Sequence, residues 1–425
     1  SHVYFFNEKT KQTINLAVSG TQNKVTLDSL YDNKINKVLN YGQKSSEVKY
    51  SFVYNVNKKF NSSNTFGAGV IADIIHFNYA DSSLLKFPSD YIRLTKFNGA
   101  SSLVQSYLKW QHKFSDKLVL NSGVHCQQFL LNNSLAIEPR LGIKWNFTSK
   151  QSAGIGGGMH SQLQPMSIYF YETHNNDNTY TRTNKNLDFS RSNHLVLTYD
   201  NAFALNWRMK TEIYYQHLYD IPVEIPKSNF SVLNIGADFV IPNVDSLKNE
   251  GTGRNCGIEY TLEKFFSKNY YLLITASMFD SKYKGSDNVE HNTAFNGNYT
   301  LNALAGAEFN LDKENRKVIT INTKINYAGG KRYIPVFLTE SQIQHKAIFD
   351  YEHAFEKQYS DYSRVDIKIG FKLNMKKITQ EWNFDIQNVF NRKNVFQQVF
   401  NPRINNIQTE YQLGFFPMMT YRILF

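Results

Sequence analysis

The side chains best suited to bind a ligand lie in two stretches that combine aromatic and basic residues. These candidates are Tyr169, Tyr171, Tyr180, Arg182, Lys331, Arg332 and Tyr333. Aromatic rings and guanidinium groups on exposed loops are frequent in binding sites because they combine contact area with charge and hydrogen bonding. The same side chains would also suit an aromatic girdle at a membrane interface, or the packing of one loop on another. We therefore treat them as candidate ligand-binding residues.

No catalytic or metal-binding motif is recognisable. The glycine-rich run at 154–158 is not followed by the Gly-Lys-Ser/Thr of a phosphate loop. The histidines do not fall at metal-ligand spacing with cysteine or acidic residues, and no serine has a nucleophile context. Glu259 and Asp366 are better explained as acids on a wet strand face than as an acid/base pair. We expect no enzyme activity, no cofactor and no metal.

The last stretch of the chain indicates which elements must position the candidates. Residues 411–425 alternate so that Phe425, Ile423, Tyr421 and Met419 share one apolar face. A strand of roughly 9–11 residues with such a face and with aromatic side chains near its ends can cross an outer membrane. A terminal strand of a soluble sandwich can have the same pattern, so the rest of the chain must decide.

Apolar and polar side chains alternate most clearly late in the chain. Ile367 lies on an apolar stripe and Asp366 on a charged one, so we expect Ile367 to face lipid and Asp366 a lumen. Similar patterns predict strands near 47–58, 64–79, 100–114, 117–131, 136–148, 150–160, 192–201, 205–219, 254–265, 269–282, 297–309, 316–328, 360–373, 378–390 and 411–425. Residues 1–46 are poorly defined by pattern alone.

The connections between these strands alternate in length. Tight turns are separated by long segments, expected at 80–99, 161–191, 220–253, 284–296, 329–359 and 391–410, with one short exception at 131–136. Short turns on the periplasmic side and long loops outside are typical of outer-membrane barrels, whereas a soluble sandwich has no physical reason to sort its loops by side. The sequence therefore predicts an all-β fold, an antiparallel transmembrane β-barrel.

Composition is consistent with this prediction. The net charge is +11, but lysine and arginine are spread among acids without a basic run, so a charged lumen and headgroup contacts explain it better than nucleic acid. Cys126 and Cys256 are far apart in predicted strands, and we expect two free thiols. The opening residues from Ser1 to Tyr4 do not show the charged region followed by an apolar one that marks a signal peptide, so we expect a mature chain or an internal fragment.

Several motifs together resemble a known family. They are 257–266 (GIEYTLEKFF), 270–284 (YYLLITASMFDSKYK), 292–296 (NTAFN), 329–333 (GGKRY), 385–391 (DIQNVFN) and the ending 412–425. In this order they resemble the C-terminal barrel of TonB-dependent outer-membrane receptors, of the type with a carboxypeptidase-regulatory-like domain. The resemblance covers about residues 121–425.

The resemblance implies a 22-stranded plugged barrel, of which this chain would supply about 15–17 strands as a single barrel region, 1–425, without the plug. It implies import of an iron chelate, cobalamin, glycan or peptide across the outer membrane of a Gram-negative cell. Its implied partners are outer-membrane lipid, the TonB complex acting through the plug, strands from the same protein or a second chain, and a surface lipoprotein. Tyr421, Ile423 and Phe425 match the family's assembly signal. A passive porin or scaffold and a barrel enzyme remain the alternatives.

Overall fold

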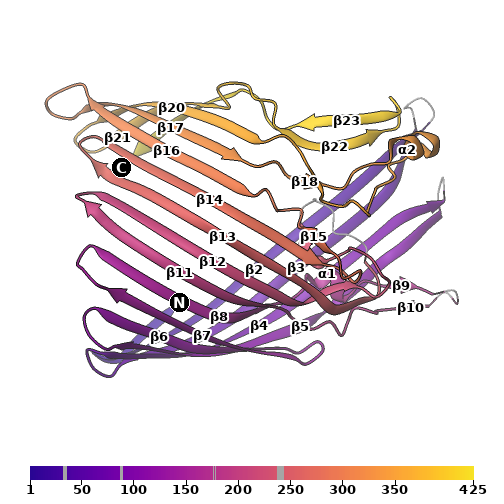
Figure 1. The fold of residues 1–425 in the computed structure, drawn as a ribbon, viewed down its shortest axis with the longest axis horizontal. Coiled ribbons are helices and arrows are strands. Elements are labelled where there is room, and N and C mark those ends of the chain that lie inside the picture. The colour runs from indigo at the N-terminus through magenta and orange to yellow at the C-terminus, as the bar shows by residue number, and fades with distance from the viewer. Residues whose placement is uncertain (32–35, 87–89, 176, 178, 237–243) are drawn as a thin grey trace.

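The computed structural model describes residues 1–31, 36–86, 90–175, 177, 179–236 and 244–425. Its main sheet contains 18 strands, and each long strand pairs antiparallel with the next long strand along the chain. The result is one continuous meander that curves around an interior (Figure 1). The predicted all-β, barrel-type fold is confirmed. In the described part of the chain, no helix has the length and apolarity to cross a membrane.

The wall begins with a short strand and four of its longest strands. They are β1 (His2–Asn7), β2 (Thr10–Tyr31), β3 (Asn36–Lys59), β4 (Asn64–Lys86) and β5 (Asp90–Lys113). The wall continues through β6 (Leu118–Phe129), β7 (Ser134–Asn146), β8 (Gln151–Gln162), β11 (Ser190–Ala204), β12 (Trp207–Glu224), β13 (Leu247–Ser267), β14 (Tyr270–Lys284), β16 (Tyr299–Asn310), β17 (Lys317–Ala328), β20 (Tyr362–Asn374), β21 (Thr379–Gln387) and β24 (Phe416–Leu424). A three-residue strand, β15 (Glu290–Asn292), pairs with the end of β14.

The connections sort by length onto the two ends of the wall (Figure 1). At one end, called the turn end, eight short connections lie at 8–9, 60–63, 114–117, 147–150, 205–206, 268–269, 311–316 and 375–378. The other end, called the loop end, carries α1 (Met166–Tyr169), β9 (Thr173–His174), β10 (Tyr180–Thr181), η1 (Val232–Asn234), β18 (Arg332–Tyr333), α2 (Leu338–Gln344), β19 (Lys357–Gln358), β22 (Val395–Asn401) and β23 (Asn406–Tyr411). The predicted alternation is observed from β8 onward, and the expected exception is observed as well, because only residues 130–133 join β6 to β7 at the loop end.

The two faces of the wall differ in polarity as the alternation predicts. Ile369 pairs with Phe384, and Phe384 with Met419, and these outward side chains are 49%, 47% and 74% exposed. One residue along, Gly370 pairs with Asn383, whose inward side chain is 9% exposed. An apolar outer face and a polar inner face are what a barrel in lipid requires.

Tyrosines crossing glycines tie neighbouring strands together on the inner face. The Tyr107 ring lies across Gly69, and its hydroxyl donates a 2.6 Å hydrogen bond to Asn55 Oδ1 two strands away. A Cβ on Gly69 would lie 2.5 Å from both the Tyr107 ring and that oxygen, so only glycine leaves room. The same arrangement joins Tyr271, Gly306 and Asn322, with a 2.8 Å bond.

Along β4, towards the loop end, the outer face changes from apolar to polar and the inner face becomes apolar. Near the middle of β4 the outward side chains are apolar, as at Val70 and Ile74, which are 42% and 47% exposed. Above Ile74, the outward positions carry polar side chains such as Asn78, while Phe77 and Tyr79 point inward and are buried. This inversion is expected where a wall leaves hydrocarbon, because the outer face then meets water and the inner face can pack against a loop.

Three sequence expectations need correction. Residues 80–99 are not a long loop, because β4 runs to Lys86 and β5 starts at Asp90, with 87–89 outside the described residues. The poorly defined start forms the short strand β1, the long strand β2 and the first part of β3, held by ladder hydrogen bonds that need no apolar pattern. The last strand begins at Phe416 rather than 411, because residues up to Tyr411 belong to the β22–β23 hairpin.

The sheet has two edge strands. Within the described residues β1 pairs only with β2, and β24 pairs only with β21, and no ladder joins β1 to β24. The last strand presents Tyr421 and Ile423 outward, 51% and 38% exposed, and Phe425 follows it fully exposed. The role of Tyr421, Ile423 and Phe425 in assembly stays a prediction.

Candidate functional site

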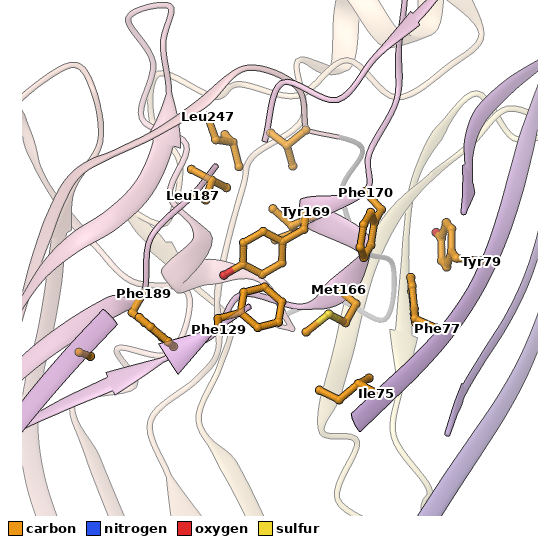
Figure 2. Packing of buried hydrophobic residues seen from close by; sticks show 13 residues of the cluster. Ile75, Phe77, Tyr79, Phe129, Met166, Tyr169, Phe170, Leu187, Phe189 and Leu247 are labelled. Atoms are coloured by element: carbon orange, nitrogen blue, oxygen red, sulfur yellow. The ribbon is translucent and has the colours of Figure 1, made fainter. Parts of the chain in front are cut away.

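The first long loop, residues 163–189, folds inward at the loop end and builds an apolar cluster there. Tyr169 and Phe170 of this loop pack against Phe77 of β4 and Phe129 of β6, as Figure 2 shows. Tyr169 and Phe129 have no exposed surface. The loop therefore packs on the inward apolar side chains of β4 near the loop end. This packing explains why β4 carries apolar residues on its inner face as well as on its outer face.

A buried carboxylate fixes the rest of the loop to the wall. Glu172, 7% exposed, accepts from Arg182 of the loop at 2.9 Å and pairs with Arg93 of β5 at 3.0 Å. It also accepts a 3.3 Å hydrogen bond from the backbone N–H of Lys96. Two cations and one backbone donor satisfy a carboxylate that would otherwise be costly to bury. The loop is thus held against β5 by charge as well as by apolar packing.

The same two arginines stack on aromatic rings. The Arg93 guanidinium lies 4.0 Å from the centre of the Tyr180 ring, and that of Arg182 lies 5.3 Å from the Phe97 ring. Phe97 itself stacks on Phe170 with ring centres 3.4 Å apart. Two guanidinium groups sharing one carboxylate leave this aromatic surface with a net positive charge. Such a surface attracts ligands that are anionic or carry flat π systems.

The structure separates the first group of predicted site residues into two kinds. Tyr169 is wholly buried in the apolar cluster, and burial raises the pKa of its phenol, so it supports the loop and does not face a ligand. Tyr171 is half-buried, and burial, followed by Asp245, raises the pKa of its phenol. Tyr180 and Arg182 lie together at the loop surface next to Arg93. Only Tyr171, Tyr180 and Arg182 of this group remain candidates for ligand contact.

The second predicted group organises another loop, residues 329–361. The Arg332 guanidinium donates to the backbone oxygens of Asn296, Phe355 and Glu356 at 2.8–3.1 Å and to Asn298 Oδ1 at 3.2 Å. With its donors engaged in this way, Arg332 ties two loops together. The Tyr333 ring stacks on Tyr359, with centres 4.3 Å apart and planes at 4°. Lys331, which is exposed, is the member of this group best placed to reach a ligand.

The structure places the first predicted group against β4, β5 and β6, and it places Arg332 of the second group against the segment around Asn296. It adds residues that sequence reasoning missed, chiefly Arg93, Phe97 and Glu172. Arg93 and Phe97 were missed because 80–99 had been assigned to a loop. The available signal was weak: Phe77 and Tyr79 alternate at the end of the expected strand 64–79, and Asp81 continues the same spacing beyond it.

The cavities among the described loop residues include two of more than 500 Å³. One of about 510 Å³ lies beneath the first loop and is lined by His160, His194, Arg191 and apolar side chains of η1. The other, about 530 Å³, is lined on one side by residues between 228 and 236 and on the other by residues of the loop 329–361. Tyr283, which is 1% exposed, is one of the residues that line this cavity. In the described part of the chain, no three His, Cys, Asp or Glu residues are grouped to hold a metal.

Comparison with solved structures identifies the fold. The ferric preacinetobactin receptor BauA from Acinetobacter baumannii matches 99% of this chain with a TM-score of 0.65 and 14% identity. The ferric-catecholate import receptor Fiu from Escherichia coli K12 matches 99% of this chain with a TM-score of 0.69 and 9% identity. The pyoverdine outer-membrane receptor FpvA from Pseudomonas aeruginosa PAO1 also matches 99% of this chain, with a TM-score of 0.69 and 10% identity.

This chain has the fold of a TonB-dependent receptor barrel. The match spans 60–63% of the three receptors, so the chain corresponds to somewhat more than half of their length. No protein-family model and no curated protein sequence matches it. The predicted resemblance is confirmed at the level of fold, and within this receptor barrel fold the loop end corresponds to the side where long external loops are found.

Proposed function

We propose that this chain is the barrel portion of a TonB-dependent importer in the outer membrane of a Gram-negative bacterium. The observation that carries the proposal is the receptor barrel fold together with loops elaborated on one end only. In this proposal the turn end faces the periplasm and the loop end faces outside. A plug, and the strands needed to close the sheet, come from the same protein or a second chain, and TonB acts through the plug.

The proposed cargo is an iron chelate. Solved structures with this fold include receptors for ferric siderophores, and the loop surface of Arg93, Arg182 and Tyr180 suits an anionic or aromatic chelate. In this proposal Tyr171, Tyr180, Arg182 and Lys331 contact the cargo. Arg332, Tyr333 and Tyr169 hold the loops that present these side chains. Cobalamin, glycans and peptides are the other cargoes to be tested, and no catalytic role is proposed.

Uptake of radiolabelled ferric siderophores, cobalamin and oligosaccharides by whole cells tests this function. Replacing Tyr180 and Arg182 together by alanine should weaken binding of the transported compound about tenfold. A matched change at the turn end, Asn315→Ala, should leave binding unaltered, because Asn315 is exposed on a short turn far along the wall.

Two results would count against the proposal. Uptake that persists after the proton gradient is collapsed would indicate a passive porin, since a TonB-driven importer needs that gradient. Uptake that depends on the proton gradient but is unaffected by the Tyr180 and Arg182 changes would support the importer and contradict a binding site on this loop surface.

A further inference from the structure

The net positive charge of the chain is concentrated at the turn end. The eight short turns, with the two strand residues on each side of them, contain fourteen lysines and arginines. The same segments contain four carboxylates, Glu8, Asp116, Asp312 and Glu314. The turn end therefore carries ten of the eleven net positive charges, while the rest of the chain is almost balanced, with 33 basic and 32 acidic residues. Lysines that look evenly spread along the sequence are gathered by the meander into one ring.

These basic groups are available to a partner. Thirteen of the fourteen are exposed, Arg208 being the half-buried one. Arg208 pairs with Asp200, and Arg316 pairs with Glu314. The other twelve, all lysines, form no ion pair with any described residue. A ring of lysines without carboxylate partners repels itself, so an anionic partner would stabilise it.

A band of aromatic side chains accompanies this ring. All four tryptophans, Trp110, Trp145, Trp207 and Trp382, lie within four strand residues of a short turn. The Trp145 and Phe60 side chains are 54% and 52% exposed, and the Lys58 ammonium lies 4.7 Å from the Phe60 ring. Tryptophan prefers the interface where hydrocarbon meets headgroups. The lysines therefore lie at the level of lipid headgroups, just beyond the tryptophans.

We propose that the turn end of the wall is a binding ring for anionic phospholipid in the leaflet that surrounds it. Lys58 and Lys59, the last two residues of β3, and Lys376 and Lys377, on the turn 375–378, illustrate the unit, which is two consecutive exposed lysines near outward aromatic side chains. Each lysine at an anionic membrane surface favours binding about fivefold. A soluble anionic partner would not need the tryptophan band, which is why lipid is the favoured occupant.

The tryptophans provide a local probe for this lipid. The intact protein is reconstituted in symmetric bilayers of phosphatidylcholine with a minor fraction of brominated phosphatidylglycerol, which quenches tryptophan fluorescence on contact. Quenching should exceed that expected from bulk composition, with phosphatidylglycerol enriched about fivefold near the tryptophans at low salt and less so at high salt. Symmetric bilayers make the direction of insertion irrelevant.

The variant K58Q/K59Q/K376Q/K377Q should lower the enrichment towards the bulk value. A control with four exposed lysines changed at the loop end, K44Q/K227Q/K284Q/K357Q, removes the same charge and should keep the enrichment. Heat-modifiable mobility on gels confirms that both variants are folded before they are compared.

The proposal is overturned if the wild type shows no enrichment, or if the two variants lose it equally, since net charge alone would then explain it. It is also overturned if the turn-end variant keeps full lipid enrichment but loses binding of a soluble anionic fragment of the cell wall. That result would assign the lysines to a periplasmic polymer.

Discussion

At the scale of single residues, side-chain direction decides what a substitution costs. Ile367 lies on the outward stripe with Ile369 and opposite Ile386, while Gln387, the next residue along β21, points inward. Ile367→Arg should lower the free energy of unfolding by about 2–4 kcal/mol, because the new charge meets hydrocarbon. Gln387→Arg should change it by less than about 1 kcal/mol. Urea unfolding from bilayers, followed by fluorescence, measures both, and equal losses would show that the face assignment is wrong.

The inward residue Asp366 is a poor control for that experiment. Its Oδ1 accepts hydrogen bonds from Arg364 Nε at 2.7 Å and from the backbone N–H of Asn388 at 2.8 Å. Arginine there would remove the oxygen that accepts both hydrogen bonds and would place two cations together. The alternation of the sequence predicts the direction of Asp366, but it cannot predict these partners, since one of them is a backbone group beyond β21.

The tyrosine–glycine crossing gives a second residue-scale prediction. Gly69→Ala should cost about 1–3 kcal/mol, because its methyl group would overlap the Tyr107 ring and displace the hydrogen bond to Asn55. Gly156→Ala is the matched control, since the nearest atom to its new Cβ, the Leu141 backbone oxygen, is 3.8 Å away. Comparable losses in urea unfolding for both alanines would mean that glycine flexibility, rather than the crossing, sets the cost.

At the scale of elements, the first long loop owes its position to side chains that cannot touch a ligand. Tyr169→Ala should free residues 163–189 from the wall, since cutting a fully buried aromatic side chain from a packed cluster costs about 3–5 kcal/mol. Limited proteolysis should then cleave this loop, while the barrel keeps its heat-modifiable mobility. Phe390→Ala, at a side chain 75% exposed, is the control and should leave the loop protected.

Protection of the loop in the Tyr169 variant would show that the Glu172 ion pairs and the remaining apolar contacts, such as those of Phe170, are enough to hold it. A shortened loop lacking 169–180 is a less informative variant, because it removes the ligand-facing Tyr180 together with the supporting Tyr169 and Phe170.

The sequence predicts the bounds of some strands better than others. The difference depends on whether the whole strand faces lipid or extends beyond it. The expected strand 316–328 is β17, Lys317–Ala328, and the expected strand 360–373 is β20, Tyr362–Asn374. These strands alternate over their whole length because one face meets lipid throughout. The parts of β4 and β5 near the loop end were not predicted as strands. From Ile74 towards the loop end their outward face is polar, and a loop covers their inner face. The candidate site could not be predicted for the same reason, because Arg93 and Glu172 meet only where the first long loop packs against upper β4 and β5.

At the scale of the whole molecule, the open sheet is the property that most constrains the protein. The 18 strands of the main sheet run from β1 to β24 without a closing ladder among the described residues. Each unpaired backbone group at an edge in lipid costs several kcal/mol, so two open edges cost on the order of tens of kcal/mol. We therefore infer that other strands pair with β1 and β24 in the membrane.

Cysteine pairs test whether the two edges meet. With Cys126 and Cys256 replaced by serine, the pair Asn383→Cys and Thr420→Cys should form a disulfide, because these residues face each other across β21 and β24. Pairs that join β1 to β24, such as Val3→Cys or Phe5→Cys with Thr420→Cys, should remain reduced in the folded protein, because intervening strands keep them farther apart than a disulfide can reach. Mobility of the oxidised protein on non-reducing gels separates the outcomes. Edge pairs that cross-link as fully as the control pair would mean that β1 and β24 close the wall on each other, and no further strands would then be needed.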